Sequence, residues 1–140
     1  MPPDGEWFET SLAEQRQRLE RALVSLTGGV SVEKEAIEYA SHALLAYEWE
    51  GFSDSPLGEA AHTEEFLQRN PQSVLRPSLE LFQLHRYRCA FEAAGFEGNA
   101  ESRKIAAAKY VTLWKRVSAS KNLAVQAIAT EIDSSDYLYL

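Results

Sequence analysis

Helix start and stop signals recur at short intervals along the chain, and they constrain its fold more than any other feature. Serine or asparagine precedes most of the candidate helices, and glycine or proline follows most of them. Serine and asparagine side chains bind the free amide groups at a helix start, and glycine accepts the left-handed backbone beyond the last turn. These signals predict six helices, which span residues 11–28, 31–51, 55–70, 77–94, 99–120 and 122–132.

The connections between the predicted helices are short, and short connections place consecutive helices side by side as antiparallel hairpins. The alternating apolar pattern that indicates a strand occurs only in the last four residues of the sequence. We therefore expect an all-α fold of five to six antiparallel helices in a single domain, residues 1–140, arranged as a bundle or a short solenoid. Residues 133–140 form a tail, which either docks on the domain or is exposed as a partner motif.

The length and composition fit one domain with its own core. A chain of 140 residues, 45% of them hydrophobic, can bury a substantial core. Cys89 is the only cysteine, which excludes an internal disulfide and a CxxC zinc site. The sequence contains no membrane-spanning apolar run and begins with no signal-peptide pattern. We expect a cytoplasmic protein as written, or a periplasmic one if a signal peptide has been removed.

The helix predicted at about 77–94 is expected to be central. When its residues are placed at about 100° each, apolar side chains cover roughly two thirds of the circumference. A helix of this kind packs against neighbours on several sides. Its one polar strip contains His85, Arg88 and Glu92, and the last two are four residues apart, so we expect them to pair on the surface.

Arg86 projects among the apolar residues of this helix. Its guanidinium therefore either reaches solvent along the core or pairs with a buried carboxylate. Glu59 is the one acid of the preceding helix that the helical pattern turns inward. We predict an Arg86–Glu59 ion pair that fixes the register of the two helices, with Glu48 or Asp54 as substitute partners.

His62 and His85 lie on consecutive predicted helices, with Glu59 three residues before the first and Cys89 four after the second. Metal sites in helical bundles repeat Glu-x-x-His on facing helices, but here the motif occurs once and His62 is expected to face solvent. We therefore expect no metal and no cofactor, and Cys89 is expected to be a core residue. The alternative is a small metal- or ligand-binding enzyme with a pocket around His85, Arg86, Glu59 and Cys89, in which His62 is a further metal ligand.

Charge is unevenly distributed. The net charge is −7, and residues 1–65 contain 14 acids and 4 bases. Overall acidity argues against a nucleic-acid partner, and the absence of an apolar span argues against membrane insertion. We expect a non-enzymatic protein-interaction domain that presents an acidic surface, or a groove between helix hairpins, to another protein; a basic partner is one version. The predicted partner-binding residues are Glu35, Glu38, Trp49, Phe52, Glu64 and Glu65.

A family resemblance covers residues 57–95. It is carried by Ala60-Ala61 and Glu65-Phe66-Leu67, then Asn70-Pro71-Gln72-Ser73, then Ala90-Phe91-Glu92-Ala93-Ala94-Gly95. This segment resembles the helix–NPxS–helix joint of tetratricopeptide-like repeats, including those of bacterial envelope adaptors. The resemblance implies a protein-binding helical scaffold without catalytic residues.

Overall fold

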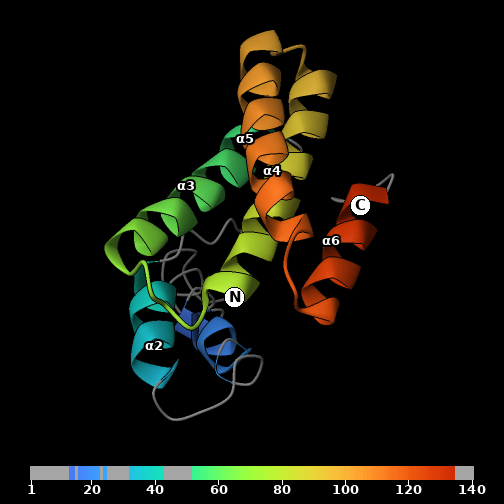
Figure 1. Cartoon of the computed structure of the whole chain (residues 1–140). Helices are drawn as coiled ribbons and strands as arrows, with labels where there is room; N and C mark the ends of the chain where they lie inside the picture. Colours follow the sequence, from blue (N-terminus) through green and yellow to red (C-terminus); the bar gives the residue numbers. More distant parts are fainter. Residues whose placement is uncertain (1–12, 15, 23, 25–31, 43–51, 135–140) are drawn as a thin grey trace, which may run out of the picture.

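The computed structural model describes residues 13–14, 16–22, 24, 32–42 and 52–134 (Figure 1). Within these ranges helix is the only regular secondary structure, which confirms the predicted all-α class. The described residues between Ala13 and Val24 are helical. The helices with defined bounds are α2 (Val32–His42), α3 (Asp54–Arg69), α4 (Arg76–Glu97), α5 (Ala100–Ser118) and α6 (Leu123–Ser134).

Two asparagines begin the last two helices, as the sequence predicts. The Asn99 side chain accepts a hydrogen bond from the Ser102 amide at 3.0 Å, where α5 begins. The Asn122 side chain accepts from the amides of Ala124 and Val125 at 2.9 and 3.3 Å, where α6 begins. Each bond satisfies a backbone donor that has no partner inside its own helix.

The C-terminal end of α4 differs from the prediction. The helix continues through Gly95 to Glu97, and Gly98 ends it with a φ of 72°. Glycine adopts this left-handed conformation without the steric penalty that a Cβ would impose, so Gly98 is the functional helix stop. The Asn99 amide then donates to the Ala94 carbonyl at 2.9 Å, which closes the last turn.

The end of α6 also lies beyond the predicted position. It includes Asp133 and Ser134, the first two residues of the predicted tail 133–140. The rest of that tail lies outside the described residues. α3 begins at Asp54, so Pro56 occupies the third helical position and not, as the sequence indicates, the first.

α4 is the central helix, as predicted, because it packs against α3, α5 and α6. In the view of Figure 1, α4 and α5 lie side by side, and the chain reverses direction between them. α3 lies on the left of this pair and α6 on the right. α2 lies below and contacts α3. No helix of the described part has the length and apolar character required to cross a bilayer.

Two apolar clusters form the core along α4. The first joins α2, α3 and the start of α4 through Ala36, Tyr39, Phe66, Leu67, Leu75 and Leu79. The second joins α3, α4, α5 and α6 through Ala60, Leu84, Tyr87, Leu113, Val117, Val125, Ala129 and Ile132. The start of α4 therefore belongs to one cluster and its middle to the other, which makes α4 the element on which the other helices are positioned.

Candidate functional site

The predicted pair between Arg86 and Glu59 is present and joins α4 to α3. The Arg86 Nε atom lies 2.5 Å from Oε2 of Glu59, and the two side chains are 28% and 13% exposed. The guanidinium also lies over the Phe82 ring, 4.7 Å from its centroid. Each charge thus has an opposite charge beside it, which offsets the desolvation that burial imposes. That the role of this pair is structural remains a prediction.

His85 and Cys89 extend the chain of contacts that begins at this ion pair. Arg86 Nη1 donates to His85 Nδ1 at 3.1 Å, and Cys89 Sγ lies 3.7 Å from the same nitrogen. Cys89 is completely buried, and burial raises the pKa of its thiol to about 11 against a smaller opposing effect of the Arg86 charge. The thiol is therefore protonated near neutral pH, whereas a nucleophilic cysteine reacts as the thiolate.

His62 does not point to solvent as the helical pattern predicts. It is partly buried, its ring centroid lies 5.0 Å from that of Tyr39, and its Nε2 lies 3.3 Å from the Tyr39 carbonyl oxygen. Beside it, the hydroxyls of Tyr39 and Thr63 share a hydrogen bond of 2.8 Å. The outer face of α3 is covered here by α2, so His62 belongs to a helix–helix contact. Among the described residues, no three His, Cys, Asp or Glu side chains are placed to share a metal ion.

Two of the acids predicted to bind a partner already have partners within the chain. Glu35 on α2 accepts a hydrogen bond of 2.9 Å from the Ser73 hydroxyl, which joins α2 to the connection between α3 and α4. Glu64 on α3 lies 3.4 Å from the Lys109 ammonium on α5. The Lys109 contact offsets part of the negative charge that the sequence predicts for this surface, whereas the Ser73 hydroxyl is neutral and leaves the charge of Glu35 unchanged.

The other residues predicted to bind a partner are spread over the surface. Glu38 is exposed on α2, and Glu65 is exposed on α3. Phe52, immediately before α3, is 52% exposed. Trp49 lies outside the described residues. The described members of the predicted set therefore come from three segments, and a partner that contacts all of them must span α2 and α3.

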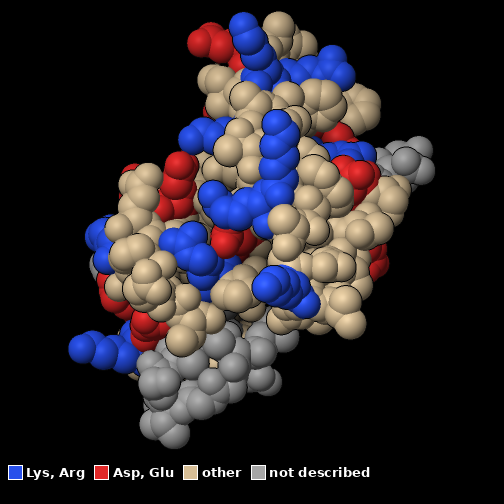
Figure 2. Space-filling model, in the orientation of Figure 1, with Lys and Arg blue, Asp and Glu red and all other residues tan. Residues whose placement is uncertain are grey.

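A groove of about 770 Å³ lies between α3 and α5, with α4 as its floor. Figure 2 shows this face, on which Lys and Arg side chains gather over α5 and over the space between α5 and α3. We call this feature the α3–α5 groove. Its lining residues are Glu64, Leu67, Gln68 and Pro71 on the α3 side, Arg76, Gln83 and Tyr87 on the floor, and Ile105, Ala108, Lys109, Thr112, Leu113 and Arg116 on the α5 side.

Glu80 holds two of the cations that line the α3–α5 groove. It is only 8% exposed, its Oε2 accepts from Arg116 Nε at 2.6 Å, and its Oε1 lies 3.7 Å from Arg76 Nη1. Nearby, the buried Gln83 donates to the Ala60 carbonyl at 3.2 Å. The helical pattern does not predict the burial of these polar side chains. The one sequence signal is Arg76 four residues before Glu80, which indicates a helical pair.

Several residues that line the groove are apolar or uncharged. Leu67 and Leu113 are buried in its walls, and Ile105 is 47% exposed on the α5 side. Burial raises the pKa of the Tyr87 hydroxyl to about 12, so this floor residue is neutral at physiological pH. The lining of the groove thus combines apolar and neutral side chains with charged ones, and protein-binding surfaces likewise combine both kinds.

Comparison of the chain with protein-family models, with curated proteins and with solved structures found no match. The resemblance of residues 57–95 to tetratricopeptide-like repeats therefore stays a prediction. The proposed function therefore rests on the geometry of the α3–α5 groove and of the contacts around the Glu59–Arg86 pair.

Proposed function

We propose that the chain is a non-enzymatic helical domain that binds a segment of another protein in the α3–α5 groove. The observation that carries the proposal is the groove itself, a channel of about 770 Å³ between two helices that both pack on α4. A groove of this kind, which is lined by both apolar and charged side chains, suits a peptide or helix because the apolar contacts supply affinity and the charges supply orientation.

The ion pair between Lys109 and Glu64 at the groove can be replaced by a contact with a bound protein. Lys109 and Glu64 are 49% and 40% exposed, and an exposed pair at 3.4 Å contributes only about 0–1 kcal/mol. A partner that offers its own charged group can therefore replace one member of the pair at little energetic expense. By contrast, the Glu80 carboxylate is buried and has two arginine partners, so it holds these two side chains of the groove lining in place.

The contacts of Glu59, Arg86, His85 and Cys89 give less support to the alternative, a small metal- or ligand-binding enzyme. The two charged members of this set neutralise each other, and the thiol is protonated near neutral pH. A catalytic group must be free to exchange a proton, a bond or a ligand during the reaction. The α3–α5 groove is lined by other residues and does not include this set.

The proposal can be tested by filling the groove. Ala108 is an exposed groove residue on α5, and Ala108→Arg places a long side chain in the channel. Ala127 is exposed on α6 outside the groove, so Ala127→Arg is the matched control. Proteins captured from a cell extract by the wild-type chain are expected to be lost with Ala108→Arg and kept with Ala127→Arg. Equal capture by both variants, with both folded by circular dichroism, would exclude the groove as the binding surface.

A further inference from the structure

The α3–α5 groove has a length and a spacing of lining residues that suit a bound helix. Its α5 wall presents Ile105, Ala108, Lys109, Thr112 and Arg116, which follow the i, i+3, i+4, i+7, i+11 spacing of one stripe of a helix. This wall spans eleven residue steps, which correspond to about 16 Å or three turns. The α3 wall follows the same spacing from Glu64 through Leu67 to Gln68, and Pro71 extends it in the turn after α3.

The arrangement of α3, α4 and α5 leaves the position of a fourth helix open. α3 and α5 both pack on α4, and the space between them is the groove. Helices pack on one another by placing the side-chain ridges of one in the grooves of its neighbours, so a groove above α4 can receive a further helix. An amphipathic helix would place its apolar stripe over Leu67, Ile105 and Leu113, whose side chains form the apolar part of the groove.

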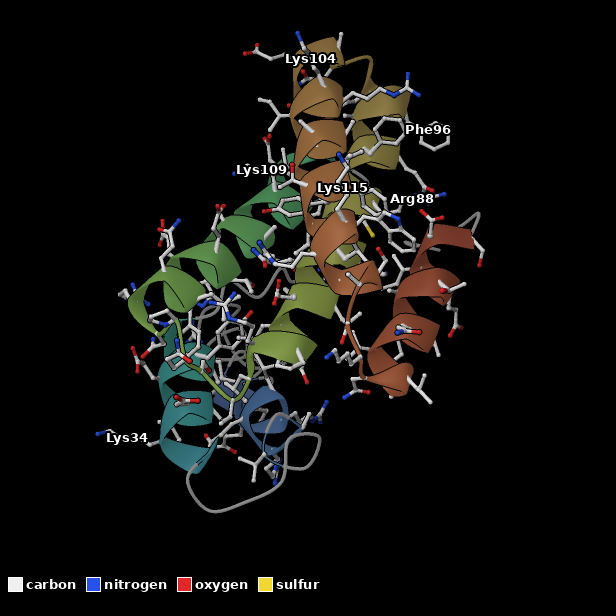
Figure 3. All side chains as sticks on the ribbon, in the orientation of Figure 1. Lys34, Arg88, Phe96, Lys104, Lys109 and Lys115 are labelled. Atoms are coloured by element: carbon white, nitrogen blue, oxygen red, sulfur yellow. The ribbon has the colours of Figure 1, made fainter. Side chains whose placement is uncertain are left out.

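The charged side chains around the groove favour an incoming helix that carries negative charge. Three cations, Arg76, Lys109 and Arg116, line it together with one acid, Glu64, and the buried Glu80 lies below two of the cations. The Arg116 side chain is 60% exposed although its Nε is bound to Glu80, and a guanidinium has further N–H donors available. Lys115 is exposed on the same helix outside the groove, and Figure 3 shows it on α5 below Lys104.

From these observations we infer that the α3–α5 groove binds an acidic, amphipathic helix of another protein, whose carboxylates contact Lys109 and Arg116. The inference rests on the proposed function and specifies its partner. A partner carboxylate at Lys109 takes the place of Glu64. The exposed N–H groups of Arg116 donate to a second partner carboxylate. The attraction combines opposite charges at a partly exposed surface, so binding weakens as the salt concentration rises.

The test is a selection from a phage-displayed library of random peptides of about 12 residues, a little over three helical turns. The immobilised full-length chain is the target, and the sequences of the enriched peptides are the first readout. We expect apolar residues at helical spacing, accompanied by Asp and Glu. A consensus that is basic or uncharged overturns the inference, and so does the absence of enrichment.

The second readout locates the binding. A fluorescently labelled peptide from the selection is titrated with the wild-type chain, with Lys109→Glu and with Lys34→Glu. Lys34 is exposed on α2, far from the groove in Figure 3, and serves as the matched charge control. We expect Lys109→Glu to weaken binding about tenfold or more and Lys34→Glu to leave it nearly unchanged. Thermal melting of each variant verifies that it is folded.

Charge exchange completes the experiment. A peptide in which Lys replaces the selected acids is expected to recover affinity for Lys109→Glu but not for the wild-type chain. Equal binding of the acidic peptide to the wild type and Lys109→Glu overturns the inference. A wild-type dimer that Lys109→Glu dissociates, seen by analytical ultracentrifugation together with no peptide binding, assigns the groove to a second copy of the chain instead.

The two proposals fail in different ways. Basic peptides that Ala108→Arg no longer binds would leave the groove as a protein-binding surface and would overturn only the acidic partner. Selected peptides that bind equally to Ala108→Arg and to the wild type would exclude the groove, and the proposed function would fail with it.

Discussion

The ion pair between Glu59 and Arg86 leads to a quantitative prediction about the stability of the α3–α4 contact. Glu59 is 13% exposed, whereas Arg86 is 28% exposed and also rests on the Phe82 ring. Arg86→Met leaves a largely buried carboxylate without its main partner, for which we expect a loss of about 3 kcal/mol. Glu59→Gln leaves a guanidinium that can turn to solvent, so the expected loss is about 1.5 kcal/mol.

The double variant isolates the interaction itself. With neither charge present there is no orphaned carboxylate, and we expect the combined substitutions to cost about 3 kcal/mol rather than the sum of the single effects. The resulting coupling energy is about 1.5 kcal/mol, within the range measured for residues in direct contact. For a chain of this size, a loss of 3 kcal/mol lowers the melting temperature by about 10 °C.

Urea unfolding of the wild type, both single variants and the double variant, followed by circular dichroism, measures these free energies. The Lys109–Glu64 pair is the control cycle, because its two side chains are 49% and 40% exposed and its coupling is expected to be about 0–1 kcal/mol. If the Glu59–Arg86 coupling is no larger than that of the control, solvent screens both groups, and a structural role for the pair would be refuted.

Three further predictions concern a buried thiol, a tyrosine and the α4–α5 junction. Cys89 in the native chain should not react with a thiol reagent at pH 8, where its pKa of about 11 keeps it protonated, and should react after unfolding. Burial raises the folded-state pKa of Cys89 from 9.0 to about 11 and that of Tyr87 from 10.0 to about 12. Their contribution to stability is therefore complete below the unfolded values and is lost as the pH rises to the folded values. Denaturant titrations at increasing pH should show this alkaline decline, and a pH-independent stability would contradict it. Asn99→Ala should destabilise the fold by about 1 kcal/mol, since the cap bond to the start of α5 is lost, and Gly98→Ala by a similar amount because φ is positive there; unchanged urea midpoints would exclude both roles.

The sequence was sufficient to predict the all-α fold class, the starts of α5 and α6, and the central place of α4. Each depends on residues within a few positions along the chain, such as Asn99 and the amide three residues later, or on the share of a helix surface that is apolar. The Glu59–Arg86 pair could be predicted as well, because both residues interrupt apolar faces of consecutive helices and Glu59 is the one acid of its helix that the helical pattern turns inward.

The end of α4 shows the limit of these local signals. Gly95 and Gly98 are both acceptable helix stops, and only Gly98 has the left-handed backbone that ends the helix. The choice depends on the turn that joins α4 to α5, in which the Asn99 amide bonds back to the Ala94 carbonyl. Local composition does not distinguish between two glycines three residues apart.

The sequence by itself determined that this chain is helical, where several of its helices begin and which helix lies at the centre, because short-range hydrogen bonds and apolar periodicity decide those properties. The tertiary structure decided that α2 covers His62, that Glu80 is buried between two arginines, and that α3 and α5 stand apart over α4. The contacts that make the groove join residues far apart in the chain, 36 positions for Glu80 and Arg116 and 45 for Glu64 and Lys109. Such contacts depend on how whole helices pack against one another, which the spacing of residues within each helix does not specify.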